Sequence, residues 1–126
     1  MHLTHRLVVV NRGRLTLSVY SAGRRLWSVP VGIGAAHTPT PAGHFWIREK
    51  FRVHDSASGY YPWAFGTADY STLTDWPGGG VVGIHGPFYE PWSIPGRVSH
   101  GCIRLRVSAD ARLAEYVGPG TPLLVR

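Results

Sequence analysis

Hydrophobic and polar residues alternate along much of this chain, and this pattern predicts short β-strands. Residues 15–20 alternate most clearly, with the period of two that a half-buried strand requires. Short apolar runs at residues 7–10 and 26–31 flank this segment, and turns containing glycine separate the three. We therefore expect an antiparallel meander here, with Pro30 at a sheet edge or a strand end.

Residues 44–53 form the longest predicted strand, because apolar and mostly basic side chains alternate along it. The segments on either side predict loops. Residues 32–43 are too rich in glycine and proline for regular structure. Residues 54–80 show little periodicity but many aromatic side chains, so we expect an ordered lid or groove wall, or a cover for a second small core. The strand's expected apolar face carries Phe45, Ile47, Phe51 and Val53.

The last third of the chain predicts short strands at residues 81–85, 103–105 and 123–125, with a loop at residues 86–98. One helix is also expected. Ser108 suits its N-cap and Asp110 its first turn. Its apolar face consists of Leu113, Tyr116 and Val117. These elements predict a single, mostly β domain over residues 1–126, with one short helix near the C-terminus.

Composition adds limits to this picture. A chain of 126 residues that is 44% apolar can form one core without cross-links. The net charge of +6 should attract polyanions, but the basic residues are scattered, as on a solvated surface. No run of ~18 apolar residues predicts a membrane span. Residues 1–6 lack the apolar core of a signal peptide, so we expect no integral membrane segment and see no signal peptide.

The lone cysteine is the strongest candidate for chemistry. Cys102 is a buried apolar residue, a metal ligand or a reactive thiol. A cysteine attacks as the thiolate and therefore needs a nearby base or cation. His100 lies two residues before it, and His85 lies 102 − 85 = 17 residues before it, at the end of a predicted strand. Pairing of the strands around this loop would bring His85 and Cys102 together at the mouth of one cleft.

Four ordered motifs resemble the L,D-transpeptidase catalytic domain of the YkuD-like family. The central two are His85-Gly86 and the run from Ser99 through His100, Gly101 and Cys102 to Arg104. The others are the Thr-Pro-rich segment at residues 38–45 and the closing Gly-Thr-Pro-Leu at residues 120–123, and the strand at residues 15–20 also fits. Together they cover nearly the whole chain.

This resemblance implies a β-sandwich-like fold with one short helix and a defined reaction. Cys102 is the implied nucleophile and His85 the implied base, oriented by the backbone carbonyl of Gly86, as in a triad with a main-chain member. The implied donor is a peptidoglycan stem tetrapeptide, which loses D-alanine and forms a thioester. An amine then gives a 3→3 cross-link, whereas water gives L,D-carboxypeptidase activity. We expect no cofactor and a monomer, and the implied function leads us to expect an extracytoplasmic location in the periplasm or cell wall.

Several further residues are candidates for the site. Backbone N–H groups at Gly101 and Cys102 suit an oxyanion. Arg104 would grip a substrate carboxylate or form a structural ion pair, and Ser99 and His100 would support the loop or contact substrate. For three aromatic residues, a place in the groove wall competes with simple packing; these are Tyr60, Tyr61 and Trp92.

Two other classes of function compete with the enzyme. His85, His100 and Cys102 are all suitable zinc ligands, but a fourth ligand at metal-type spacing is absent, so we expect no metal. A basic β module could instead hold single-stranded nucleic acid or wall polymer without catalysis. The enzyme hypothesis expects stem peptides and no nucleic acid as partners. Replacing Cys102 with alanine separates these classes, because only the enzyme would lose its function.

Overall fold

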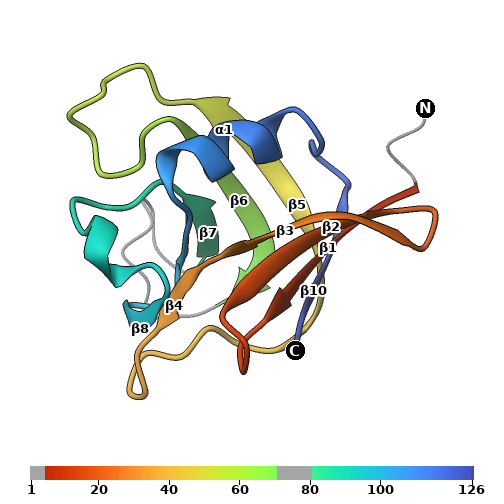
Figure 1. Cartoon of the computed structure of the whole chain (residues 1–126), viewed down its shortest axis with the longest axis horizontal. Helices are drawn as coiled ribbons and strands as arrows, with labels where there is room; N and C mark the ends of the chain where they lie inside the picture. Colours follow the sequence, from red (N-terminus) through yellow and green to blue (C-terminus); the bar gives the residue numbers. More distant parts are fainter. Residues whose placement is uncertain (1–4, 71–80) are drawn as a thin grey trace.

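The structure, a computed structural model, describes residues 5–70 and 81–126, whose strands form one sheet curled around a core. The strand order is β3-β2-β1-β10-β5-β6-β7-β9-β4-β8, and one short α-helix packs on the sheet (Figure 1). The predicted mostly β fold with one short helix is confirmed. The elements are β1 (Arg6–Asn11), β2 (Thr16–Ser21), β3 (Arg24–Pro30), β4 (Gly32–Gly34), β5 (Gly43–Arg52), β6 (Trp63–Tyr70), β7 (Val81–His85), the 3₁₀ turn η2 (Pro91–Ser93), β8 (Gly96–Ser99), β9 (Ile103–Arg104), α1 (Val107–Ala114) and β10 (Pro122–Val125).

Strands β1, β2, β3 and β10 form one side of the molecule, which we call the meander half (right in Figure 1). β1 pairs antiparallel with β2, and β2 with β3, as the alternation predicts. Pro30 ends β3, which is the edge strand, so the missing N–H interrupts no ladder. β10 inserts between β1 and β5, parallel to the first and antiparallel to the second. Apolar side chains from these strands, such as Leu17 and Leu123, are buried in the core.

Strands β4, β7, β8 and β9 form the opposite side, which we call the site half (left in Figure 1). The loops predicted at residues 32–43 and 86–98 are wrong in part, because they contain β4, η2 and β8. Gly32 of β4 pairs with Gly96 and with Arg104, which are far away in the sequence. These partners satisfy the backbone of a segment that has no periodicity of its own.

The loop predicted at residues 54–80 is also wrong in part. Strand β6 occupies its centre and pairs antiparallel with β5 and β7. Ala64 and Phe65 point to opposite faces of this strand and are both fully buried, so β6 has none of the polar alternation that marks a half-exposed strand. Residues 71–80 of the predicted loop lie outside the described part of the chain.

Strand β5 departs from its predicted faces. Its register with β6 shifts between Ile47 and Glu49, and such an irregularity changes which side chains face the core beyond it. As a result Phe51 is 44% exposed, whereas Lys50 turns inward and donates hydrogen bonds to the carbonyls of Ala114 and Val117. Partial burial lowers the pKa of Lys50.

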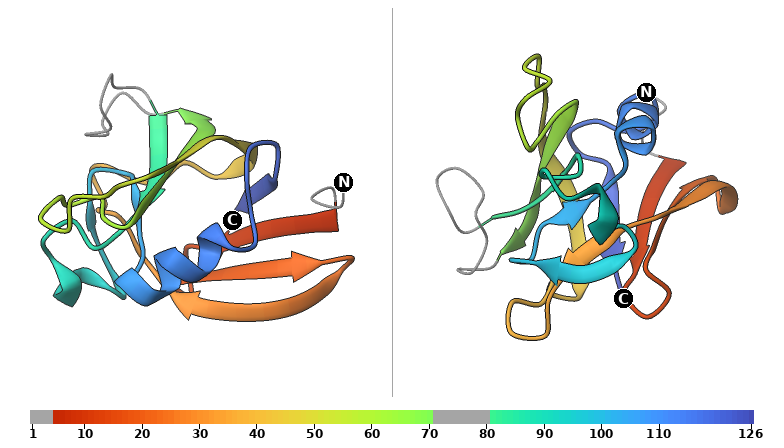
Figure 2. Two further views of the ribbon diagram at one scale, coloured as in Figure 1. Left: turned by 90° about the horizontal axis from the view of Figure 1, so that it is seen from above. Right: turned by 60° about the vertical axis from the view of Figure 1, so that its left-hand side comes forward.

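Helix α1 lies between the meander half and strands β5 and β6 (Figure 2). It begins at Val107 with Arg106 as N-cap, so the prediction of a Ser108 cap is wrong; Ser108 lies in the first turn. Asp110 is fully buried and accepts the N–H of Trp63 at 2.9 Å, which ties the helix to β6. Burial raises the pKa of this carboxyl to about 8, an effect that the Trp63 hydrogen bond partly opposes. Within residues 5–70 and 81–126, no helix is long and apolar enough to cross a membrane.

Candidate active site

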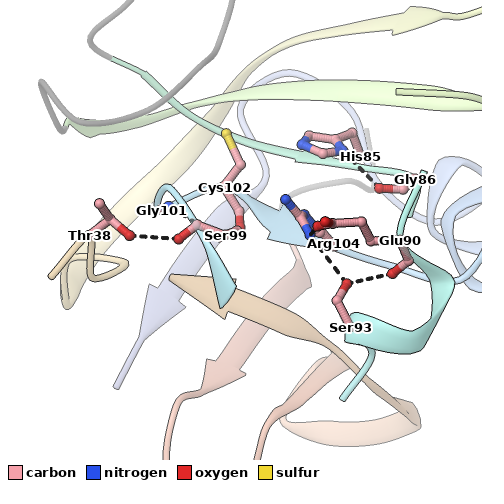
Figure 3. Close-up of polar contacts among 9 residues, drawn as sticks. All are labelled: Thr38, His85, Gly86, Glu90, Ser93, Ser99, Gly101, Cys102 and Arg104. Atoms are coloured by element: carbon pink, nitrogen blue, oxygen red, sulfur yellow. Dashed lines mark hydrogen bonds and ion pairs between the residues drawn. The ribbon is translucent and has the colours of Figure 1, made fainter. Parts of the chain in front are cut away.

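The pairing of β7 with β9 brings the predicted nucleophile and base together. These strands are parallel, with Ile84 opposite Ile103. Cys102 precedes β9 and therefore lies beside Gly83, whose N–H donates to its Sγ at 3.3 Å. His85 is two residues after Gly83 on the same strand, so the imidazole and the sulfur lie on one face of the sheet. Figure 3 shows both side chains pointing toward the same side of β7.

The imidazole of His85 is held in one orientation by the backbone carbonyl of the next residue and by aromatic rings. Its Nδ1 lies 2.8 Å from the carbonyl oxygen of Gly86. A carbonyl can only accept a hydrogen bond, so Nδ1 carries the proton and Nε2 is the basic nitrogen of the neutral ring. The Tyr60 ring meets the imidazole edge-on at 4.5 Å, and the Phe88 ring lies 6.0 Å away. Tyr60 is thus a packing partner of His85.

Gly86 is required at this position for steric reasons. A Cβ here would lie 1.7 Å from the carbonyl oxygen of Tyr61, closer than two non-bonded atoms can approach. The segment around residues 60–61 therefore runs against the bare backbone of Gly86, and the Gly86 N–H donates to the Tyr60 carbonyl. This close approach supports the carbonyl that orients His85.

The turn that carries Cys102 is fixed by hydrogen bonds of Ser99. Its Oγ donates to the Cys102 carbonyl at 2.7 Å and accepts the Gly101 N–H at 3.1 Å. Ser99 thus joins both sides of the turn that precedes β9. The Gly101 N–H, expected as an oxyanion donor, is engaged with Ser99 in this conformation. Gly101 has a φ of 114°, which favours glycine.

Two threonines brace this turn from outside, and their roles were missed in the sequence. The Oγ1 of Thr38 donates to the Ser99 carbonyl, and that of Thr40 donates to the Gly101 carbonyl, both at 2.7 Å. Thr40 Oγ1 also accepts the N–H of Gly34 at 3.0 Å. Both threonines lie in the Thr-Pro-rich segment, so the available signal was a pair of hydroxyls held by prolines.

Arg104 forms an ion pair with Glu90. Its Nη1 lies 2.5 Å from Glu90 Oε1 and 3.3 Å from Ser93 Oγ (Figure 3). Its guanidinium also lies 5.0 Å from the centre of the Phe88 ring. Arg104 is 4% exposed, so this contact anchors the segment after Gly86 to β9. Glu90 and Ser93 were not identified from the sequence.

Both candidate side chains are buried, which corrects the expected position at a cleft mouth. Cys102 is 4% exposed and His85 is 2% exposed. The sulfur clusters with Ala64, and partly buried residues including Tyr60 pack around it. Neighbouring side chains therefore cover most of Cys102 in this structure.

The remaining predicted residues lie farther out. His100 is exposed on the turn between β8 and β9, and Trp92 is 69% exposed on η2. Tyr61 lines a hollow that Phe88 separates from His85. Within the described residues, no three His, Cys, Asp or Glu side chains gather as metal ligands, so the zinc hypothesis has no ligand cluster there.

Comparison with known proteins agrees with this geometry. The YkuD family model, described as the L,D-transpeptidase catalytic domain, matches residues 5–125. YkuD of Bacillus subtilis is 30% identical over 118 residues, covering 94% of this chain and 64% of that protein. L,D-transpeptidase 1 of Mycobacterium tuberculosis is 32% identical over 125 residues, covering 87% of this chain and 46% of that protein. The chain thus spans less than two thirds of either relative.

A solved structure shares the fold as well. The L,D-transpeptidase of Enterococcus faecium, in a mutant with one cysteine replaced by serine, superposes with a TM-score of 0.73 at 26% identity. The match covers 97% of this chain and 50% of that one. The chain therefore belongs to the YkuD family of L,D-transpeptidase catalytic domains.

Proposed function

We propose that this chain is the single catalytic domain of a cysteine-dependent L,D-transpeptidase acting on peptidoglycan stem peptides. One observation carries the proposal: Cys102 lies against β7 on the same face as His85, whose Nδ1 is held by the Gly86 carbonyl. This is the arrangement of nucleophile, base and orienting group that acyl transfer needs. Family membership supports the same reaction class.

In the proposed first step, Nε2 of His85 takes the thiol proton and the sulfur of Cys102 attacks a peptide carbonyl. That carbonyl joins the third stem residue to the terminal D-alanine. The C–S bond forms, the C–N bond breaks, and His85 returns the proton to the departing amine of D-alanine. The hydrogen bond from Gly83 favours the charged sulfur, because a donor stabilises a thiolate more than a thiol.

In the second step, the amine of a neighbouring stem attacks the thioester. Its proton passes to His85, the C–S bond breaks, and a 3→3 cross-link forms with the thiol restored. Water in place of the amine gives L,D-carboxypeptidase activity with the same residues. The substrate places this chemistry outside the cytoplasm, and one copy of the chain contains every group that the steps use.

Mass spectrometry with a defined stem tetrapeptide tests this function. We expect an adduct on Cys102 equal to the tetrapeptide minus D-alanine, with free D-alanine in solution. An added amine should convert the adduct to an amide product. The Cys102→Ala variant should form no adduct and release no D-alanine, while circular dichroism shows an unchanged fold. Undiminished D-alanine release by this variant would show that Cys102 is not the nucleophile.

The base has its own test. His85→Gln retains a side chain of similar size but cannot take the thiol proton at neutral pH. Its rate of D-alanine release should fall by about 10²–10⁴-fold, the usual contribution of a general base. Modification of Cys102 by iodoacetamide should also slow at neutral pH and recover at alkaline pH, where hydroxide ionises the thiol. If the variant and the wild type have the same pH profile of modification, His85 is not the base that ionises Cys102.

A further inference from the structure

A hollow beside the candidate active site has no role in the chemistry described above. It measures about 330 Å³, the small end of the ~300–1,000 Å³ range of ligand pockets. Two loops form its walls: residues 56–61, which follow β5, and residues 87–91, which follow β7. Three aromatic side chains line what we call the aromatic hollow, and these are Tyr61, Phe88 and Tyr89.

The backbone that presents two of these rings is strained. Phe88 and Tyr89 have φ values of 54° and 65°, and neither is glycine. Bulky residues in this left-handed region are uncommon, and strain of this kind concentrates at ligand clamps and active sites. The Phe88 N–H donates to the Gly59 carbonyl at 2.8 Å, which joins the two walls. A Cβ on Gly59 would lie 2.8 Å from the Phe88 ring and 2.9 Å from the Tyr89 ring, so glycine lets the rings approach.

The aromatic hollow adjoins the base. Phe88 forms its inner wall, and the same ring lies 6.0 Å from the His85 imidazole. Tyr89 stands at the outer side, 71% exposed and 5.4 Å from Phe88. The Phe88 ring is therefore shared between the lining of the hollow and the surroundings of His85.

The lining selects a neutral ligand with both apolar and hydroxyl surfaces. None of the described residues that line the hollow is charged, although the protein carries a net charge of +6. Hydroxyls come from Ser56, Ser58 and the two tyrosines, and ring faces from Tyr61, Phe88 and Tyr89. An anionic polymer would gain no cation here, and a purely apolar ligand would exclude water from these hydroxyls without replacing its hydrogen bonds.

We infer that the aromatic hollow is a saccharide subsite, which holds one sugar unit of the wall glycan to which the stem peptide is attached. A hexosamine ring offers apolar C–H faces for the aromatic rings and hydroxyl and amide groups for the lining hydroxyls. The inference rests on the proposed function, because it assigns to the hollow the neutral sugar that accompanies the reacting peptide. It places substrate recognition on both sides of Phe88.

Kinetics with paired substrates test the inference. D-alanine release is measured from a free stem tetrapeptide and from the same peptide linked to its N-acetylated disaccharide. We expect the wild type to have the higher kcat/KM for the disaccharide form. Tyr89→Ala should reduce that preference by about threefold to tenfold, the value of one aromatic contact. Tyr89→Phe should retain most of it.

Trp46→Ala is the matched control, because Trp46 is an exposed aromatic residue on β5 and is 53% exposed. It should preserve the preference for the disaccharide form. Equal kcat/KM values of the wild type for both substrates would overturn the inference. An undiminished preference in Tyr89→Ala would also overturn it.

A binding experiment keeps the subsite distinguishable from the catalytic proposal. A soluble oligomer of N-acetylglucosamine is titrated into ¹⁵N-labelled Cys102→Ala protein, and the amide signals are followed by NMR. We expect saturable shifts at Gly59, Phe88 and Tyr89, which Tyr89→Ala abolishes. If neither peptide substrate releases D-alanine, the proposed function fails, and these shifts alone decide on the subsite. Absence of these NMR shifts would overturn the saccharide subsite.

Discussion

The meander half and the site half of this sheet are held together in different ways. In the meander half, β1 and β2 each contribute six residues to an unbroken antiparallel ladder over buried aliphatic side chains. In the site half, β9 has only two residues and β4 three. Buried polar groups take the place of long ladders there, including His85, Ser99 and Arg104.

This difference predicts that the two halves contribute differently to stability and to the proposed activity. Apolar burial is non-directional, so the meander half can lose contacts without changing the direction of any catalytic group. The buried polar groups of the site half act through directed hydrogen bonds, and their loss leaves partners unsatisfied and moves the turn of Cys102. Substitutions in the two halves should therefore have different ratios of stability loss to activity loss.

The largest expected change in stability comes from the meander half. Leu17 is fully buried, and Leu17→Ala removes apolar contacts and leaves a cavity. The free energy of unfolding should fall by about 2–5 kcal/mol. At a temperature where the variant remains folded, kcat/KM for D-alanine release should match the wild type. Denaturant titration and kinetics on the same sample measure both quantities, and a selective loss of kcat/KM would break the comparison.

Asp110 should make stability depend on pH. Burial raises its pKa in the folded state to about 8 from an ordinary value of 3.8. Below pH 4 the carboxyl is protonated in both states, whereas between pH 4 and 8 only the unfolded state loses the proton. Stability should therefore fall as pH rises through this window and level off above it.

The matched variant for this prediction is Asp110→Asn, whose side-chain oxygen can still accept the Trp63 N–H. It has no carboxyl to ionise, so its unfolding free energy should lack the loss between pH 4 and 8. Urea titrations at several pH values compare the slopes of the two proteins. Parallel curves would show that Asp110 does not titrate in this range.

Arg104 should have a smaller effect on stability and a larger effect on activity. Arg104→Met keeps the apolar stem but removes the cation from Glu90, Ser93 and the Phe88 ring. We expect the free energy of unfolding to fall by about 2–3 kcal/mol. This is less than for a fully buried pair, because the Glu90 side chain is 37% exposed to water. The D-alanine release rate of the folded variant should fall, because Phe88 no longer has its anchor beside His85. Glu90→Gln, which keeps a hydrogen-bond acceptor, should show a weaker form of both effects.

Thr40 provides the finest comparison. Thr40→Val preserves shape but removes the hydroxyl that joins Gly34 to Gly101. The Gly34 N–H and the Gly101 carbonyl lose this partner. We therefore expect the free energy of unfolding to fall by about 1–2 kcal/mol and D-alanine release to become slower. Ser18→Ala, which removes a hydroxyl bonded to Ser28 in the meander half, should leave the rate unchanged. Equal effects of the two substitutions on the rate would contradict a special role for the site half.

The sequence by itself determined the elements whose signals are local. Alternation at residues 15–20 and its flanking runs identified the meander, because a half-buried strand repeats every two residues. The apolar residues Leu113, Tyr116 and Val117 indicated the helix, although it ends at Ala114, before two of them. The N-cap was also misplaced by two residues, at Ser108 and not Arg106. The motifs around His85 and Cys102 identified the family, since they are contiguous in the chain.

Only the tertiary structure decided how the site is assembled. β4 and β8 exist because distant segments pair with them, and short strands of this kind leave no periodic signal. The register shift between β5 and β6 reversed the expected exposure of Phe51, and no residue in β5 indicates this shift in the sequence. The contacts of Thr40 with Gly101 and of Glu90 with Arg104 depend on folding across long stretches of chain. Local pattern specifies which side chains can be buried, whereas the partners of a buried polar group are chosen by three-dimensional proximity, which one sequence does not contain.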